Sequence, residues 1–275
     1  MNNLLQRKSI VIPFTFLLFV WITAICIPLI SPYSDDINGA VNFKIGPTPP
    51  SLSHWFGTDI AGRDMFTLTI YAGISSLKVG ILSILIAVLI GMPLGIIAGL
   101  EKGWVEDTIM RISDGFLAFP PLILPMLITA VLGPSLSNVI IGIGISWFPW
   151  YARIARAQAL IISEQDYVLV SKSMGANRYH ILKKHIFPNS LNPVLVQATI
   201  DVGYAILISS GLSFIGLGAQ PPEVEWGLLI TQSRAQFLSH WWVVFFPGLF
   251  IILSVISFNL IGDGIKSLLS PRFNR

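Results

Sequence analysis

The sequence predicts an all-α membrane protein that crosses the bilayer with six helices, and two features of the chain predict this. Its 275 residues are 53% hydrophobic and only 11% charged, whereas a soluble domain carries about 25% charged residues. The mean hydropathy of +0.74 indicates that most side chains do not face water. The apolar residues also gather in stretches of about 20, the length of helix that crosses a hydrocarbon core.

Six apolar stretches follow one another along the chain, with more polar segments between them. They run over residues 10–30, 74–100, 108–132, 138–160, 193–217 and 241–261. The first is long for a signal peptide and has no convincing cleavage site, so we interpret it as an uncleaved span. The third contains Pro120, Pro121 and Pro125. We expect a kinked helix there, because packed neighbours can satisfy the carbonyls that prolines leave free.

The distribution of Lys and Arg predicts that both termini face the cytoplasm. Thirteen of these residues fall on the side of the termini, three fall on the other side, and Lys78 lies in or beside the second span. The thirteen are Arg7, Lys8, Lys102, Arg111, Arg153, Arg156, Lys172, Arg178, Lys183, Lys184, Lys266, Arg272 and Arg275. The expected regions are a tail and first span over 1–31, an extracytoplasmic segment over 32–73, a core over 74–262 with a cytoplasmic loop near 155–190, and a tail over 263–275.

The longest polar interruption of the core covers residues 153–189. It holds six Lys and Arg residues against two acidic residues, and its apolar residues recur at helical spacing. An ordinary basic loop would explain the charges, but a simple loop between spans is usually shorter. We therefore predict a structured cytoplasmic element that binds a partner. Gly175 is expected to turn the backbone within it, and Pro188 is expected to end its last helix before Asn192 and Pro193 begin the next span.

One acidic residue falls at membrane depth. Asp201 lies about eight residues into the fifth expected span, where an ionised carboxylate costs at least about 2.5 kcal/mol. One interpretation is a residue of a transport pathway that meets a cationic cargo. The other is a structural carboxylate paired with another helix, such as one of a second subunit. The residues alone leave both interpretations open.

Several chemistries lack the residues that they require. A phosphate-binding loop needs Lys followed by Ser or Thr after its second glycine, whereas Gly216 is followed by Leu217 and Gly218. The chain therefore has no nucleotide site of its own, and energy for transport must come from elsewhere. Ser and Asp occur at membrane depth without a histidine, which gives no support to an intramembrane protease triad.

The residues also give no support to a bound metal, a disulfide or nucleic-acid binding. The histidines at 54, 180, 185 and 240 show no metal-ligand spacing, so we expect no bound metal. The single cysteine, Cys26, lies inside an apolar run and is expected to be a small buried hydrophobe. No basic patch with interleaved aromatic residues suggests nucleic acid.

Three blocks of the sequence resemble the permease subunits of ABC importers, in the peptide/nickel branch of that family. Gly175 is followed thirteen positions later by Pro188, like the glycine and proline of the family's EAA loop. A later block, residues 212–227, is similar to the branch's LSFLGLG…PP…WG pattern. An earlier block resembles its outer HxFGTDxxGRD signature and contains Gly57, Thr58, Asp59, Gly62, Arg63 and Asp64. The resemblance covers nearly the whole chain.

Some positions depart from the family pattern. Leu169, Val170 and Ser171 stand where the EAA motif has its Glu-Ala-Ala, so the acid is absent. Peptide members often carry a Glu before the LSFLG block, whereas residues 209–211 read Ser-Ser-Gly. Nickel-type members also lack that acid and have an aromatic run similar to residues 147–153. We therefore favour a permease for nickel or a metal chelate, with a di- or oligopeptide importer as the alternative and a passive channel as an alternative from another class.

The resemblance implies a type I ABC importer permease fold in a bacterial or archaeal cell membrane. It implies a second permease subunit, one or two ATPase subunits that bind ATP and magnesium, and an extracytoplasmic solute-binding protein. The chain itself would be no enzyme and would hold no cofactor. The expected pathway residues are Asp201, Ser209 and Ser210. The expected contacts with the ATPase are Ser173, Met174, Gly175, Ala176, Asn177, Arg178, Tyr179, His180 and Pro188.

Overall fold

A computed structural model describes residues 2–269 of the chain. The described residues form helices joined by turns and loops, and an isolated bridge between Thr58 and Asp64 is the β-type pairing found among them. Arg272 and Arg275, which contributed to the predicted topology, lie outside this range, and the Arg7 side chain is likewise not described. The elements are α1 (Asn2–Ile30), η1 (Ser34–Asn38), α2 (Met65–Glu101), α3 (Trp104–Leu117), α4 (Ile123–Leu132), α5 (Leu136–Ser163), α6 (Asp166–Ser173), α7 (Arg178–Ile181), η2 (Leu182–Ile186), α8 (Phe187–Phe214), α9 (Trp226–Ser233), η3 (Arg234–Gln236) and α10 (Trp242–Leu269).

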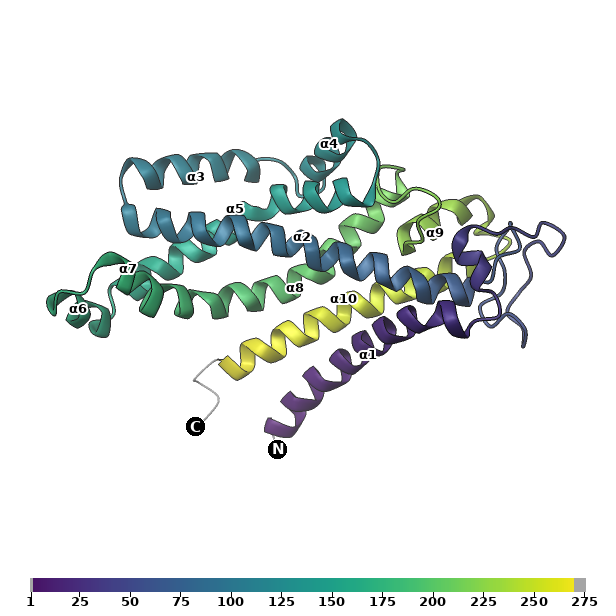
Figure 1. The fold of residues 1–275 in the computed structure, drawn as a ribbon, viewed down its shortest axis with the longest axis horizontal. Coiled ribbons are helices and arrows are strands. Elements are labelled where there is room, and N and C mark those ends of the chain that lie inside the picture. Colours follow the sequence, from purple (N-terminus) through teal and green to yellow (C-terminus); the bar gives the residue numbers. More distant parts are fainter. Residues whose placement is uncertain (1, 270–275) are drawn as a thin grey trace.

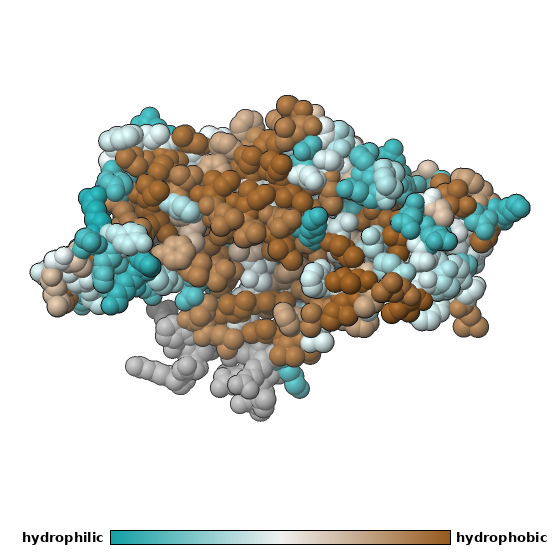
Figure 2. Space-filling view, viewed as in Figure 1, coloured by the Kyte–Doolittle hydropathy of each residue, from teal (hydrophilic) through white to brown (hydrophobic). Residues whose placement is uncertain are grey.

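The predicted all-α membrane architecture is confirmed. Within the described chain, four continuous helical stretches are long and apolar enough to cross a membrane: Ile10–Ile30, Met65–Glu101, Arg178–Phe214 and Trp242–Leu269. The 28-residue α5 is also long but more polar, with Arg153 and Arg156 in its second half. Figure 2 shows a broad apolar belt over the middle of the molecule, between more hydrophilic ends. Such a belt is what a bilayer would cover.

The third expected span, over residues 108–132, is not one kinked helix. The 14-residue α3 ends at Leu117 and the 10-residue α4 begins at Ile123. Pro120 and Pro121 lie between the two helices. Consecutive prolines cannot donate backbone hydrogen bonds, and each restricts the residue before it to an extended conformation, so the helix stops instead of bending. The expectation of a continuous kinked helix is therefore wrong.

Pro188 does not end a helix, contrary to the prediction. The chain runs from α7 through the π-helical turn η2 into α8, with Pro188 in the first turn of α8. The N–H of Phe187 donates to the carbonyl of Leu182, five residues back. The wider turn accommodates a proline that would otherwise collide with the carbonyl four residues before it. The polar segment is thus continuous with the following span.

The helices that surround the interior pack closely because small residues lie between them. α2 and α5 run along each other (Figure 1), and a Cβ added at Gly95 of α2 would collide with the carbonyl oxygen of Ala152 in α5. α8 packs on α10 and α2, and α1 packs on α10 and α2. Small residues let helices approach in a membrane, where dispersion and not the hydrophobic effect holds them together.

The two ends of the molecule differ in structure. Figure 1 shows the start of α1 and the end of α10 toward the same end as α6 and α7, whereas the segment between α1 and α2 lies at the opposite end.

α2 begins at Met65, earlier than the expected residue 74. α10 continues to Leu269, beyond the expected residue 261.

Candidate functional site

The turn between α6 and α7 is built around one glycine. Gly175 has a φ of +86°, a left-handed conformation that only glycine adopts without strain. Its N–H donates to the carbonyl of Lys172 at 3.0 Å, and the N–H of Ala176 donates to that of Ser171 at 3.1 Å. This pair of bonds is the Schellman arrangement that ends a helix. The side chain of Asn177 then accepts from the His180 N–H at 2.8 Å and begins α7.

The predicted coupling residues lie together at one end of the molecule and are mostly exposed. Met174 is 83% exposed and Tyr179 is 67% exposed, and Lys183 lies over the Tyr179 ring at 5.9 Å. Beneath this surface Val168 and Ile181 are buried in the main hydrophobic core. The segment therefore presents apolar side chains outward while buried neighbours hold it in place. The predicted set is Ser173, Met174, Gly175, Ala176, Asn177, Arg178, Tyr179, His180 and Pro188, of which all but the half-buried Ala176 are exposed.

Ion pairs connect this end of the molecule to the helices behind it. Nη1 of Arg178 lies 3.1 Å from Oε1 of Glu101, the last residue of α2. In α5, Arg156 pairs with Glu106 of α3. The first pair joins the turn to the end of α2, and the second joins α5 to α3.

A cavity of about 440 Å³ opens beside Asp201, near the middle of α8. The hydroxyl of Tyr151 donates to Oδ2 of Asp201 at 2.6 Å, and Nε2 of Gln197 donates to Oδ1 at 2.9 Å. Among the side chains that the structure describes, none of the ion pairs includes Asp201. Its carboxylate is oriented by two neutral groups and lacks a counter-cation there. The lining residues are Pro121, Trp147, Trp150, Ile154, Gln197, Asp201 and Tyr204.

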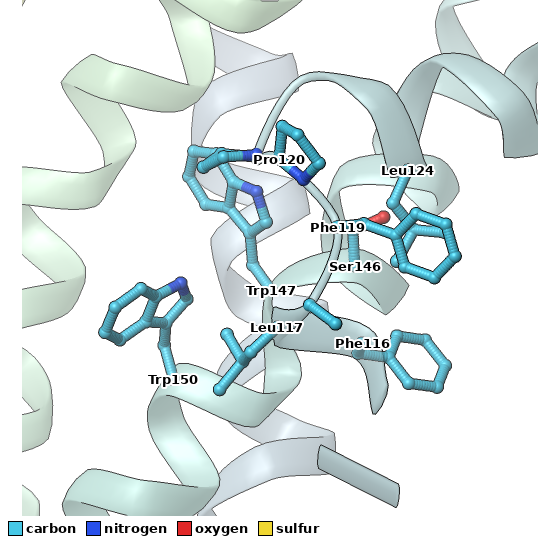
Figure 3. Close-up of a pocket in the computed structure, with 10 residues that line it drawn as sticks. Phe116, Leu117, Phe119, Pro120, Leu124, Ser146, Trp147 and Trp150 are labelled. Atoms are coloured by element: carbon cyan, nitrogen blue, oxygen red, sulfur yellow. The ribbon is translucent and has the colours of Figure 1, made fainter. Parts of the chain in front are cut away.

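Aromatic rings form one wall of this cavity. Trp147 of α5 stacks on Tyr204 of α8, with ring centroids 5.2 Å apart and planes 16° apart. Trp147 and Trp150 also line a second hollow of about 360 Å³ beside the break between α3 and α4. Figure 3 shows these two tryptophans on α5, with Trp147 next to Pro120 in that break. The prolines that interrupt the third expected span therefore sit against the aromatic wall.

The other two predicted pathway residues lie in a different place. Ser210 donates to Oε1 of Glu225 at 3.2 Å, and Ser76 of α2 donates to the same oxygen at 3.2 Å. Oε2 of Glu225 accepts from the N–H of Leu228 at 3.0 Å, which caps α9. Ser209 is buried, and its hydroxyl has no hydrogen-bond partner among the described residues. Neither serine lines the cavity at Asp201.

Glu225 is a residue that the sequence prediction missed. It is fully buried and joins α2, α8 and α9 through the hydrogen bonds just described. An acid just before the Trp226-Gly227 pair of the later motif was the available signal, because acidic residues favour helix N-termini.

The residues of the predicted outer signature form a hydrogen-bonded cluster, the outer cluster, at the opposite end of the molecule. Asp64 caps α2, since its Oδ2 accepts from the N–H of Thr67 at 2.8 Å, and its Oδ1 lies 2.9 Å from Nδ1 of His54. Asp59 accepts from Nε of Arg63 at 2.7 Å, and Arg63 reaches Gln232 of α9 at 3.0 Å. The signature thus closes the loop over the start of α2 and ties it to α9.

One further hydrogen bond and two glycines determine the shape of this outer cluster. Nε1 of Trp242, the first residue of α10, donates to the carbonyl of Thr58 at 3.0 Å. Gly57 has a φ of +73°, and Gly62 a φ of +74°. A Cβ at Gly57 would lie 2.5 Å from the carbonyl oxygen of Thr48. Both glycines of the signature are therefore required by the backbone itself.

The outer cluster contains a carboxyl group with a shifted pKa. Burial raises the pKa of Asp36 above its ordinary value, and the negative charges of Asp64 and Asp59 raise it further. The backbone N–H of Asp64, which donates to Asp36 at 2.7 Å, and the charge of Arg63 act in the opposite direction. Asp36 lies in η1, outside the spans.

Solved structures share this fold. The structure titled "Inward facing conformations of the MetNI methionine ABC transporter: CY5 native crystal form" matches with a TM-score of 0.63 at 19% sequence identity. The match covers 75% of this chain and 98% of that chain. At this identity the likeness shows the fold alone, and it confirms the predicted type I importer permease fold.

Relatives of known name are more similar in sequence. The probable D,D-dipeptide transport system permease protein DdpC of Escherichia coli K12 is 44% identical over 85% of this chain and 78% of its own length. The dipeptide transport system permease protein DppC of Alkalihalophilus pseudofirmus is 41% identical over 98% of this chain and 87% of its length. The glutathione transport system permease protein GsiD of Pectobacterium atrosepticum is 39% identical over 81% and 74%.

A family model also matches the chain directly. Residues 91–275, about two thirds of the sequence, match the binding-protein-dependent transport system inner membrane component. This stretch contains the turn at Gly175, the cavity at Asp201 and the buried Glu225. The chain therefore belongs to the family of binding-protein-dependent transport system inner membrane components, the permease subunits of ABC importers.

Proposed function

We propose that this chain forms half of the translocation pathway of an ATP-driven importer of di- or oligopeptides. The observation that carries this proposal is the set of relatives at 39% to 44% identity, which are named as dipeptide and glutathione permeases. They align with most of the chain, including the part that holds the cavity. Cargo of this class is an amino acid chain with a free ammonium and a free carboxylate.

The preference for nickel drawn from the sequence is not supported by these relatives. It depended partly on the absence of a Glu at residues 209–211. In the structure a buried carboxylate reaches that place from elsewhere, because Ser210 donates to Glu225 of the later motif. Small residues before the LSFLG block therefore leave space for Glu225 and give no indication of a metal cargo. None of the named relatives suggests a passive channel.

Energy enters, in this proposal, through the turn between α6 and α7. The exposed Met174 and Tyr179 offer apolar contacts to an ATPase subunit, which would bind ATP and magnesium. Leu169 and Val170, which replace the acidic motif, are also exposed at 46% and 58%. Apolar contact then takes the place of an acidic anchor. The ion pair from Arg178 to Glu101 and the unbroken helix from α7 into α8 connect the turn to two long helices.

We assign the remaining partners from the family and from the membrane side that each end of the molecule would face. The end with α6, α7, the start of α1 and the end of α10 faces the cytoplasm, in accord with its excess of Lys and Arg. The outer cluster, at the other end, faces the extracytoplasmic solute-binding protein. A second permease subunit completes the pathway, and one or two ATPase subunits drive it from the cytoplasmic face of a bacterial or archaeal cell membrane.

Reconstitution tests this proposal. The chain, its partner permease and the ATPase subunits are placed in liposomes with the binding protein, and uptake of labelled L-alanyl-L-alanine and of radioactive nickel is measured with and without ATP. We expect peptide to accumulate only when ATP and the binding protein are present. Accumulation of nickel without peptide would overturn the peptide assignment, and equilibration of peptide without ATP would overturn the importer.

A further inference from the structure

We propose that Asp201, beside the ring pair of Trp147 and Tyr204 and with Trp150 nearby, binds the α-ammonium group of the cargo on its way through the membrane. The inference rests on the proposed function, because it concerns the cargo of the same pathway. Neither the family match nor the relatives assign a role to these residues.

Asp201 places an acidic group at membrane depth. An ionised carboxylate at membrane depth costs several kcal/mol unless it has partners or a wet cavity. Tyr151 and Gln197 supply one hydrogen bond to each oxygen, whereas a carboxylate can accept about four. Positively charged partners are absent within the described chain. A cation that enters the cavity would therefore find an oriented acceptor with free lone pairs.

Aromatic rings line the same cavity. Trp150 is 50% exposed and Tyr204 is 43% exposed, so both present ring surface to the cavity. The stacking of Tyr204 on Trp147 fixes the orientation of its ring. Cations bind over the faces of such rings at about 6 Å or less, most strongly over Trp. The combination of one carboxylate and aromatic faces recognises an organic ammonium.

The site does not suit a metal ion. The part of the chain described by the structure contains no group of three or more His, Cys, Asp or Glu residues that would hold one. An ammonium needs only hydrogen-bond acceptors and ring faces, which the cavity offers. Its volume of about 440 Å³ falls within the range of about 300–1,000 Å³ typical of small-molecule sites.

A pair of substitutions separates charge from structure. Asp201→Asn removes the charge and keeps the size of the side chain. Tyr151→Phe keeps the charge and removes the hydrogen bond that orients it. In liposomes with the complete complex, we expect Asp201→Asn to lower ATP-driven uptake of L-alanyl-L-alanine about tenfold. ATP hydrolysis stimulated by the binding protein should change less than about twofold. Tyr151→Phe should lower uptake much less, and Asp201→Glu should restore part of it.

A binding measurement tests the ammonium itself. Saturation-transfer NMR on the complete permease–ATPase complex, without binding protein, compares L-alanyl-L-alanine with N-isobutyryl-L-alanine, in which a methyl group takes the place of the ammonium. We expect a stronger signal from the dipeptide in the native complex and equal signals in Asp201→Asn.

Three outcomes would overturn the inference. These are normal uptake by Asp201→Asn, an equal loss in Tyr151→Phe, and dissociation of the two permease subunits in Asp201→Asn, which would make the carboxylate an anchor between subunits. Each is distinct from failure of the proposed function, in which the native complex would not import the peptide at all.

Discussion

Arg178, the first residue of α7, pairs with Glu101, the last residue of α2, with 3.1 Å between Nη1 and Oε1. The two residues are 77 positions apart in the sequence. This contact links the turn at Gly175 with the 37-residue α2, which in turn packs along α5. A force applied to the turn would therefore reach the helix pair next to the cavity.

Charge exchange tests this link. Arg178 is 83% exposed and Glu101 is 44% exposed, so each single change should alter the free energy of unfolding by less than about 1 kcal/mol. We expect Arg178→Glu and Glu101→Arg to lower uptake per ATP hydrolysed, because like charges push the turn away from α2. The double variant should recover uptake. If the double variant transports no better than the singles, the ion pair has no part in coupling.

The hydrogen bond from Trp242 to Thr58 should contribute to the stability of the outer cluster. Trp242→Phe keeps an aromatic ring but removes the N–H that reaches the carbonyl of Thr58 at 3.0 Å. We expect the free energy of unfolding to fall by about 1–3 kcal/mol, because a buried carbonyl loses its donor. Thermal unfolding of the purified protein measures this. Trp241→Phe, at the exposed neighbour, should change the midpoint very little.

Gly57 and Gly39 form a matched pair for the backbone of the same region. Both have a positive φ, +73° and +87°, so Ala is strained at either position by about 1–2 kcal/mol. A Cβ at Gly57 would also meet the carbonyl of Thr48 at 2.5 Å, whereas nothing lies within 4 Å at Gly39. Gly57→Ala should therefore lower the unfolding midpoint more than Gly39→Ala. Equal shifts would contradict the close contact at Gly57.

The raised pKa of Asp36 predicts a dependence of stability on pH. A carboxyl whose folded pKa exceeds its ordinary value of 3.8 binds more protons in the folded state than in the unfolded state. Its contribution to stability is therefore largest at low pH and is lost as pH rises from about 4 through the raised pKa. In Asp36→Asn this part of the pH dependence should disappear, as measured by unfolding midpoints between about pH 4 and pH 7. Asp35→Asn, at an exposed neighbour, should leave the profile unchanged.

Composition and periodicity predicted the all-α class and the position of α1, because apolar stretches report directly on what a membrane requires. They did not predict the break between α3 and α4. Whether prolines bend a helix or end it depends on the neighbours that satisfy the freed carbonyls, and these are distant in sequence. The passage of Pro188 through a π-helical turn was missed for the same reason, since local rules treat a proline as a stop.

Some features of the candidate sites could also be predicted from the sequence, and others could not. The turn at Gly175 and the acid at Asp201 were visible as single residues whose chemistry conflicts with their surroundings. The sequence did not reveal that Tyr151, fifty residues earlier, orients Asp201, or that Glu225 receives Ser210 and Ser76. Such groupings arise from packing between helices. The outer signature was recognised as a motif, but its caps and its bond to α10 became apparent only in three dimensions.

We propose that an ATPase subunit drives this chain through the turn between α6 and α7, and the variant Gly175→Pro tests this coupling. Proline holds φ near −65°, whereas Gly175 requires +86°, so the turn cannot keep its shape. The measurement is peptide taken up per ATP hydrolysed, in liposomes that contain the complete complex, with Gly115→Ala on α3 as a control. We predict that Gly175→Pro reaches the membrane and hydrolyses ATP but accumulates almost no peptide, while the control transports normally. Normal uptake per ATP in Gly175→Pro would show that this turn does not couple ATP hydrolysis to transport.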